Sequence, residues 1–319
     1  MKTFLTNNPK QAAKFIMKSD VVAFPTETVY GLGANVFDEA AVRKIYKLKG
    51  RPKDNPLIVH ISNKKQLNLL ASGISKAANA LIKKYFPGPL TVILKKNDIV
   101  PDIVTAGLDS VAVRMPSSKI AREFINSCGV PVAAPSANLS GAPSPTDFTH
   151  VLEDFGGKVS CILIGPKARY GLESTVIDCS GDIPQVLRPG IITIEELQKI
   201  DKRIKLKKSN SKIKSPGTKY RHYSPKAKVI IVKRLHKHNL KKLSAYIGIQ
   251  TLPAIFRNKL GKYKHCKTML EYAKSLFSFF RECDMNGIKI IYVEKVDEKG
   301  IGLAVMNRLK KASFSNNKR

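Results

Sequence analysis

The sequence predicts an α/β protein in two parts, and three observations predict it. Short apolar runs typical of strands alternate with segments of helical periodicity, which indicates a layered α/β architecture. A basic stretch poor in large apolar side chains, residues 206–226, interrupts this alternation, which then resumes on a smaller scale. Because 319 residues are many for one hydrophobic core, we expect a first domain over 1–205, a linker over 206–226 and a second domain over 227–319.

Seven runs rich in aliphatic residues predict the strands of the first domain. They are residues 20–25, 56–61, 90–96, 110–115, 160–165, 174–179 and 184–188. Helices are expected between them, and two carry capping signals. Asp38 can cap a helix that runs toward Lys49, and Thr193 with Glu196 forms a capping box.

The second domain repeats the alternation of strand and helix. Residues 226–232 and 287–295 are predicted strands. Apolar side chains recur at helical spacing in residues 266–283, and a last helix is expected in 303–312. This order is typical of a small Rossmann-like unit.

The formal net charge of +32 is concentrated in the second part of the chain. Residues 1–200 hold 25 Lys and Arg against 17 Asp and Glu, a net +8, whereas residues 201–319 hold 31 against 7, a net +24. Such a surface attracts polyanions, and weak binding of tRNA or other RNA is one interpretation. A general richness in lysine explains the charge equally well.

Neither a membrane segment nor an export signal is visible in the sequence. The longest apolar runs are far shorter than the roughly 20 residues of a membrane-spanning helix, and the first residues lack the apolar core of a signal peptide. The five cysteines are widely spaced without a C-x-x-C pair, so we expect small buried side chains rather than disulfides or a zinc site. We expect a cytoplasmic protein that does not bind membranes.

Motifs that are absent narrow the chemistry. The chain has no G-x-x-x-x-G-K-[ST] phosphate loop, and Val36 stands where the dinucleotide fingerprint after Gly31 and Gly33 needs glycine. A G-x-S-x-G elbow and an H-E-x-x-H helix are absent from the sequence as well. Any nucleotide must therefore be held by polar side chains at the ends of strands, where α/β proteins build their sites.

Three loops carry such side chains. Each of the first two has two possible interpretations, a ligand site or a purely structural role. The first, residues 24–34, contains Thr28 ahead of two glycines and is also typical of an ordinary strand-to-helix turn. In the second, Lys49 and Arg51 precede Pro52, which stops the helix and projects the loop outward. A guanidinium and an ammonium so close together suit a polyphosphate. A solvated basic helix end is the alternative.

His60 ends the strand that follows the second loop, and a buried core histidine explains it as well as a ligand contact does. The third loop, residues 131–146, follows a buried apolar strand and offers Ser136, Asn138 and Ser144 as short donors and acceptors for phosphate. Its alternative is a capped loop, in which Ser144 or Thr146 starts the helix that runs toward Phe155.

Nine sequence motifs occur in an order that points to a known family. They are FPTETVYGLGA, KGRPKDNPLIVH, FPGPLTVIL, VAVRMP, APSANLSG, ESTVIDCS and VLRPG, followed by SPGTKYRHYSP and GLAVMNRLKKA. The first seven resemble the YrdC-like domain of threonylcarbamoyl-AMP synthases, and the last two resemble the linker and second domain of the long form of that family. The resemblance implies a twisted, mixed, open sheet flanked by helices, followed by a smaller Rossmann-like α/β domain.

The resemblance also implies an activity. Members of the family make threonylcarbamoyl-AMP and pyrophosphate from L-threonine, bicarbonate or CO2, and ATP, with Mg2+. The product serves the N6-threonylcarbamoyladenosine modification of tRNA, which the tRNA threonylcarbamoyl-transfer machinery completes. A non-catalytic RNA-binding or ribosome-assembly factor with the same fold is the alternative.

The resemblance implies site residues, motif by motif. Those implied to contact threonine or its carbamate are Thr28, His60, Arg114, Ala134 and Ser174. Those implied to contact the nucleotide are Arg51, Asn55, Ser110, Ser136, Ser144, Arg188 and Tyr223. The catalytic set at the phosphates is implied to be Lys49, Arg51, Ser136 and Asn138. Since Tyr223 lies in the linker, the resemblance implies a linker that folds over the pocket as a lid, with Mg2+ held through the ATP phosphates rather than by side chains.

Overall fold

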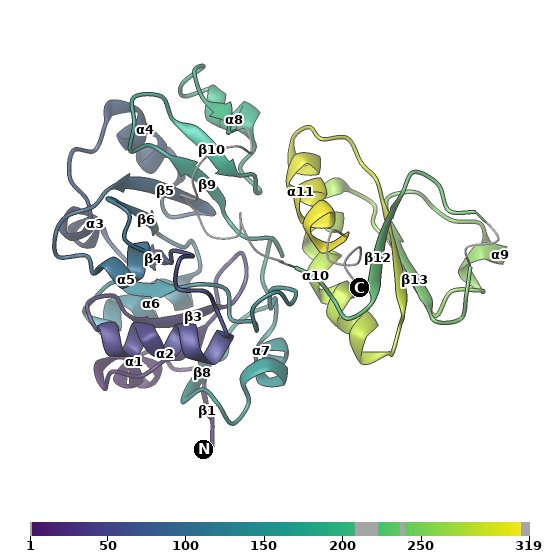
Figure 1. The fold of residues 1–319 in the computed structure, drawn as a ribbon, viewed down its shortest axis with the longest axis horizontal. Helices are drawn as coiled ribbons and strands as arrows, with labels where there is room; N and C mark the ends of the chain where they lie inside the picture. Colours follow the sequence, from purple (N-terminus) through teal and green to yellow (C-terminus); the bar gives the residue numbers. More distant parts are fainter. Residues whose placement is uncertain (1, 208–222, 237–239, 314–319) are drawn as a thin grey trace.

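The computed structural model of the chain describes residues 2–207, 223–236 and 240–313. Within these ranges the chain forms two α/β bodies, each around its own sheet, as Figure 1 shows. The first body holds an eleven-stranded sheet and the second a four-stranded one, which confirms the predicted α/β class. Most of the predicted linker, residues 208–222, lies outside the described residues, and its function as a lid stays a prediction.

The large sheet is mixed and open, with the strand order β1-β8-β2-β3-β7-β4-β6-β5-β9-β10-β11. Its strands are β1 (Phe4–Thr6), β2 (Val22–Phe24), β3 (Gly31–Asn35), β4 (Ile58–His60), β5 (Leu90–Lys95), β6 (Ser110–Arg114), β7 (Val132–Ala134), β8 (Cys161–Leu163), β9 (Thr175–Asp178), β10 (Gln185–Arg188) and β11 (Lys205–Leu206). β4 and β6 run parallel, while β2 and β3 are antiparallel. All seven strands predicted from the apolar runs are present, as β2, β4, β5, β6, β8, β9 and β10.

Helices cover both faces of this sheet. They are α1 (Pro9–Met17), α2 (Glu39–Lys49), α3 (Lys64–Leu70), α4 (Lys76–Tyr85), α5 (Asp102–Thr105), α6 (Lys119–Cys128), α7 (Phe148–Phe155) and α8 (Ile194–Gln198). α1 and α6 pack on one face, and α2, α3 and α4 belong to the core on the other. Asp38 caps α2 and Thr193 opens the capping box of α8, as predicted. The cap of α7 is Asp147, so neither Ser144 nor Thr146 starts this helix.

The glycine-containing stretch after β2 is a strand and not the predicted loop. Gly33 pairs with Val22 in the antiparallel β2–β3 ladder. A Cβ atom on Gly33 would come within 2.6 Å of Val132 Cγ1 and 2.9 Å of the Phe24 ring. Glycine therefore lets the neighbouring strand and the Phe24 ring pack closely, and the loop that can meet a ligand shortens to residues 25–30.

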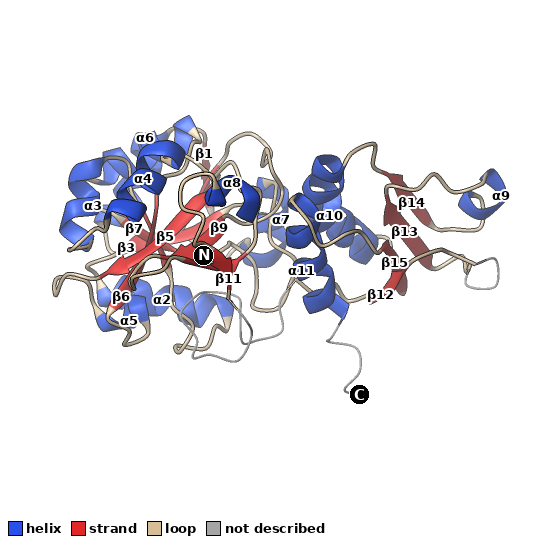
Figure 2. Cartoon of the chain, turned by 90° about the horizontal axis from the view of Figure 1, so that it is seen from above, coloured by secondary structure: helices blue, strands red, loops and turns tan. Residues whose placement is uncertain are grey.

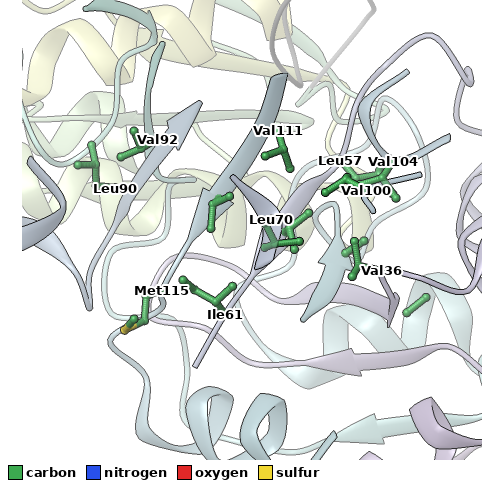
Figure 3. Close-up of a cluster of buried hydrophobic side chains, with 14 of the residues drawn as sticks. Val36, Leu57, Ile61, Leu70, Leu90, Val92, Val100, Val104, Val111 and Met115 are labelled. Carbon is green, nitrogen blue, oxygen red and sulfur yellow. The ribbon is translucent and has the colours of Figure 1, made fainter. Parts of the chain in front are cut away.

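One continuous apolar cluster supports the middle of the large sheet (Figure 3). It joins Leu90 and Val92 of β5 and Val111 of β6 to side chains of the helices, such as Leu70 of α3. All four are at most 1% exposed. Truncating a leucine in such a core to alanine costs about 2–5 kcal/mol of unfolding free energy. The strands that carry the polar side chains described below are therefore rigidly supported.

The small sheet is entirely parallel, with the order β12-β15-β13-β14. Its strands are β12 (Lys228–Val232), β13 (Ser244–Gly248), β14 (Lys262–His265) and β15 (Ile290–Glu294), and its helices are α9 (Ala254–Arg257), α10 (Met269–Met285) and α11 (Ile301–Ser313). The two predicted strands, β12 and β15, and the two predicted helices, α10 and α11, are confirmed. In the usual doubly wound sheet, the first strand in sequence lies between the second and the fourth. Here the fourth strand, β15, lies between the first, β12, and the second, β13.

Helices α10 and α11 lie between the two sheets, as Figure 2 shows. Arg281 of α10 crosses to the first body, where its Nη2 atom donates to the carbonyl of Pro143 at 2.8 Å and pairs with Asp154 at 2.7 Å. The Arg281 side chain is buried. The two bodies are therefore joined by a buried polar contact as well as by the chain.

The five cysteines are buried and free, as their spacing predicts. Burial raises the pKa of Cys128 to about 12, which leaves its thiol protonated and unreactive at neutral pH. No helix in the described part of the chain is both long and apolar enough to cross a bilayer.

Candidate functional site

A cavity opens at the ends of several strands of the large sheet. Its wall combines the β2–β3 loop, the end of α2, the loop after β7 and the polar ends of β4, β6 and β10. Eleven of the predicted site residues line it: Thr28, Lys49, Arg51, His60, Arg114, Ala134, Ser136, Asn138, Ser174, Arg188 and Tyr223. A concave site lined by convergent polar side chains at the ends of strands is where α/β proteins usually bind their ligands.

Three predicted residues do not belong to this wall. Ser110 begins β6 and Arg114 ends it, so at about 3.3 Å per residue the two lie about 13 Å apart along the strand. Ser144 is fully buried and donates to Glu173 Oε1 at 2.5 Å. Asn55 is also buried, outside the wall. Direct contact of these three residues with a nucleotide therefore stays a prediction, and their position outside the cavity wall does not support it.

Lys49, the last residue of α2, points into the protein and not to solvent. Its Nζ donates to the main-chain carbonyls of Ser136, at 2.6 Å, and of Asn138. Burial, and after it the positive charge of Arg51, lower the pKa of Lys49 well below 10.5. The other lysines near it in sequence, Lys44, Lys47 and Lys53, are exposed.

Arg51 also turns inward, whereas the sequence predicts a loop that projects outward. Its Nε donates to the carbonyl of Asn55 at 3.2 Å and its Nη2 to the carbonyl of Pro56 at 2.9 Å. Gly50, in the left-handed conformation with a φ of 58°, ends α2 and makes the turn between the two cations. Burial lowers the pKa of Arg51 to about 10, so its guanidinium stays charged at neutral pH.

The loop after β7 presents Ser136 and Asn138 beside Lys49. The Ser136 hydroxyl donates to Asn138 Oδ1 at 2.5 Å. The Asn138 amide nitrogen donates to the carbonyls of Leu139 and Ala142 at 2.8 and 2.9 Å. These bonds fix both side chains before a ligand arrives, which reduces the entropy lost on binding.

A buried ion pair stands at the end of β6. Arg114 Nη2 lies 2.8 Å from Glu27 Oε1, with side chains that are 4% and 5% exposed, and Arg114 Nη1 donates to Thr28 Oγ1 at 2.7 Å. Burial raises the pKa of Glu27, but the Arg114 guanidinium more than offsets this and holds the pKa below its usual range. Glu27 is therefore ionised and compensates most of the Arg114 charge.

His60 lies next to Arg114, because β4 and β6 pair in parallel with these two residues in register. Burial and the Arg114 charge lower the pKa of His60 to about 3, so its imidazole is neutral at neutral pH. Within the described part of the chain, its Nδ1 atom has no hydrogen-bond partner. A neutral imidazole with one nitrogen available can exchange a hydrogen bond with a ligand hydroxyl.

Arg188, at the end of β10, forms a further part of the wall with Ser174. Its Nε donates to the Ser174 carbonyl and its Nη2 to the Ser174 hydroxyl, both at 3.1 Å. Glu173 also lines the cavity and is 6% exposed. Tyr223 reaches the same cavity, and its ring stacks on Phe277 of α10 with 5.2 Å between the centroids. The second body therefore supports a residue of the cavity wall.

Two carboxylates of the site, Glu27 and Glu173, are not among the predicted residues. Each directly precedes a predicted residue, Thr28 or Ser174, in a sequence motif. Their position beside buried strands is a signal, because acidic side chains are almost never fully buried without a partner. Their partner arginines are far away in sequence, so the pairs become visible only in the fold.

In the described ranges, no three His, Cys, Asp or Glu side chains gather into a metal site. The cavity offers hydroxyl and amide oxygens, and the Glu173 carboxylate is already bonded to Ser144 and Arg308. Mg2+ that keeps several waters and binds phosphate oxygens fits this donor set better than Mg2+ ligated by protein carboxylates.

The fold and the cavity together define a class of protein. An open α/β sheet carries, in one cavity, two cations held by main-chain carbonyls and one arginine held by a carboxylate. This arrangement is that of an enzyme that brings a polyphosphate and a small carboxylic acid together without a glycine-rich phosphate loop.

Comparison with known proteins identifies the family within this class. Residues 14–190 match the family model described as "Telomere recombination", and residues 192–313 match the one described as "Threonylcarbamoyl-AMP synthase, C-terminal domain". The chain is 47% identical to the threonylcarbamoyl-AMP synthase of Pyrococcus abyssi, over 95% of this chain and 93% of that protein. It is 43% identical to the threonylcarbamoyl-AMP synthase of Bacillus subtilis, over 97% and 94%.

A solved structure supports the same assignment at the level of the fold. The crystal structure of P. abyssi Sua5 complexed with L-threonine superposes with a TM-score of 0.89 at 44% identity and covers 98% of both chains. The chain therefore belongs to the threonylcarbamoyl-AMP synthase family, in its two-domain form.

Proposed function

We propose that this cavity is the active site of an L-threonylcarbamoyladenylate synthase, which joins L-threonine, bicarbonate or CO2, and ATP and releases pyrophosphate. The observation that carries the proposal is that Lys49, Arg51 and Arg114 line one cavity. The similarity to named threonylcarbamoyl-AMP synthases over nearly the whole chain supports it. The alternative of a non-catalytic RNA-binding factor has no comparable support.

The two substrates repel each other, and the cavity supplies the charge that lets them meet. ATP is a polyanion and threonine N-carbamate is a dianion. In our proposal, Lys49, Arg51 and Arg188 receive the phosphates, with Ser136 and Asn138 as hydrogen-bonding groups at the same end. Mg2+ that arrives with ATP would neutralise phosphate charge and polarise the reacting phosphoryl group.

Threonine occupies the other end of the cavity in this proposal. Arg114 binds the threonine carboxylate, while its hydrogen bond to Thr28 Oγ1 orients the guanidinium and Glu27 serves as its charge partner. His60 exchanges a hydrogen bond with the threonine hydroxyl, while Ala134 and Ser174 complete the wall. A site built to bond a hydroxyl rejects an analogue that lacks it by about 10⁴-fold or more, because its polar groups are then left unpaired.

The chemical step requires positioning and charge stabilisation rather than a covalent enzyme intermediate. The threonine amine adds to CO2 and loses a proton, which gives the carbamate. A carbamate oxygen then attacks the α-phosphorus of ATP, the bond from this phosphorus to the bridging oxygen breaks, and pyrophosphate leaves with the electron pair. Holding two reactants in line can supply about 7–11 kcal/mol of the barrier.

The remaining parts of the proposal concern partners and domains. We propose that the product passes to the tRNA threonylcarbamoyl-transfer machinery in the cytoplasm, as the resemblance implies. The net charge of +24 in residues 201–319 supports weak binding of tRNA. Domain boundaries near residues 205 and 227 are supported by the last strand of the large sheet, β11, and the first of the small sheet, β12.

The experiment measures pyrophosphate release by the purified chain with ATP and Mg2+. Release should require L-threonine and bicarbonate together, and mass spectrometry should detect threonylcarbamoyl-AMP. L-2-Aminobutyrate, which is threonine without its hydroxyl, is the matched control and should support release far more weakly. Pyrophosphate release that is indifferent to threonine contradicts the proposal.

A further inference from the structure

Helix α11 of the second body reaches the back of the cavity wall through Arg308. This side chain is fully buried. Its Nε lies 3.2 Å from Glu173 Oε2, and its Nη1 donates to the carbonyl of Pro189, the residue after Arg188. Arg308 therefore contacts one residue of the cavity wall and the chain neighbour of another.

The same guanidinium borders Tyr223. Its Cζ atom lies 5.6 Å from the centroid of the Tyr223 ring, and Phe277 stacks on that ring at 5.2 Å. The next residue, Ser224, donates from its main-chain N–H to the carbonyl of Gly141 at 2.8 Å and from its hydroxyl to a carbonyl of α11 at 3.3 Å. Where Tyr223 enters the cavity, the chain is thus held between the loop after β7 and the second body.

Glu173 brings a negative charge into a cavity that we propose to hold anions. Burial raises its pKa, yet the charges of Arg308 and Arg188 and the hydroxyl of Ser144 hold the pKa below its usual range, so the carboxylate is ionised. An ionised carboxylate repels phosphate, and the repulsion is strong where water is excluded. Arg308 does not itself line the cavity, and it compensates this carboxylate from behind.

We propose that Arg308 is a positioning residue of the synthase, which compensates the charge of Glu173 and holds Tyr223 in the cavity. The second domain then completes the active site of the first domain, and does not merely follow it in the chain. This inference rests on the function proposed above and adds a role for the second domain.

The competing explanation is that Arg308 only fastens the two bodies together. Arg281 is the matched control, because it is also a buried arginine of the second body that bonds to the first, while its carbonyl partner, Pro143, lies outside the cavity wall. Lys310 is a control on α11 itself, since its side chain is half-exposed and forms a surface ion pair.

The experiment determines kcat and KM for ATP in the full-length chain, with the unfolding temperature as a check on folding. We expect Arg308→Met to lower kcat/KM by about 10²-fold, the order expected from a misplaced catalytic group, mainly through a higher KM. Arg281→Met and Lys310→Met should lower it far less. The double variant Glu173→Gln/Arg308→Met carries no uncompensated carboxylate, and we expect it to recover much of the lost activity.

The rescue distinguishes charge compensation from docking, because the removal of a second contact cannot repair a docking defect. Unchanged kcat/KM in Arg308→Met would overturn the inference, and so would a folded double variant that is no more active than Arg308→Met. If Arg308→Met does not fold, the folded double variant decides: high activity supports compensation and inactivity overturns it. Failure of the wild-type chain to make threonylcarbamoyl-AMP is a separate result, which overturns the proposed function itself.

Discussion

The two ends of the cavity hold their cations in different ways. Lys49 and Arg51 donate to main-chain carbonyls, whereas Arg114 is paired with the Glu27 carboxylate. A carbonyl dipole orients a cation without cancelling its charge, while a carboxylate cancels most of it. One end therefore stays positive, as a polyanion requires, whereas at the other end Glu27 offsets most of the charge of Arg114.

Solvent screening does not explain this difference. Lys49 and Arg114 are equally buried, each 3% exposed. What differs is the chemical nature of the partner that the fold places beside each cation. The contrast between the ends can therefore be tested by changing one charge or one partner at a time.

The largest effect is expected from Arg51→Ala, which removes a charge from the positive end. Synthesis should fall by about 10³-fold or more, the order lost when an arginine is removed from a transferring phosphoryl group. Pyrophosphate release measures the loss, and thermal unfolding checks that the chain still folds. Lys53→Ala changes an exposed lysine close by in the sequence and should leave turnover unchanged. Normal turnover in Arg51→Ala would refute a phosphate-binding function for this end.

Arg114→Lys probes the other end of the cavity and should have a smaller effect. Lysine keeps the charge but loses the planar fork that faces Glu27 and that, in our proposal, binds the threonine carboxylate. The KM for threonine should rise about 10- to 100-fold, as expected when a charge-assisted hydrogen bond worth about 1.5–3 kcal/mol is lost. The KM for ATP should change much less. Kinetics with each substrate varied in turn measures both, and equal rises in the two KM values would show that the ends are not separate.

A second variant separates ligand binding from stability at this end. Glu27→Gln keeps the guanidinium but leaves it buried without its carboxylate, which costs about 3–5 kcal/mol of unfolding free energy for a pair of this kind. Urea unfolding should show a larger loss for Glu27→Gln than for Arg114→Lys. The opposite order would mean that the pair is held mainly by contacts other than its charges.

The parts of the site that are local in sequence can be predicted from it. His60 and Arg114 end two apolar runs, and the residue that ends a strand is visible from its neighbours alone. The burial of Lys49 can also be predicted from its neighbours. It lies four residues after Ile45 and three after Tyr46, which are both buried residues of α2. That spacing places it on the buried stripe of the helix, whereas Lys47 falls on the exposed side.

Pairings between distant segments could not be predicted in this way. Glu173 meets Arg308 across 135 residues, and no local pattern near either residue names the other. Ser110 shows the converse, since it directly precedes the matching motif VAVRMP, yet it lies at the opposite end of β6 from Arg114. Strand order and direction are set by the packing of the whole sheet, so they decide which strand ends share a cavity.

The smallest expected effect is a pH dependence at one end only. Because the pKa of Lys49 lies well below 10.5 in the free protein, its amine is neutral over a pH window in which free lysine is charged. A bound phosphate favours the ammonium form, so ATP binding takes up a proton in that window. Raising the pH makes the uptake less favourable, and the affinity for ATP should fall by up to about tenfold per pH unit. His60, with a pKa of about 3, should give threonine binding no inflection between pH 5 and 8.

Titration calorimetry with ATP alone, in two buffers of different ionisation enthalpy, counts the protons taken up on binding. The wild-type chain should take up about one proton per ATP above the pKa of Lys49, and Lys49→Met, which keeps a similar stem without the amine, should take up none. The variant should bind ATP more weakly, with an affinity that does not vary with pH. If the affinity of the wild-type chain for ATP does not change with pH, the two hydrogen bonds from Lys49 to main-chain carbonyls outweigh the effect of burial on its pKa. The positive end would then be fully charged before ATP arrives, and the contrast with the end around Arg114 would be larger than the pKa of Lys49 indicates.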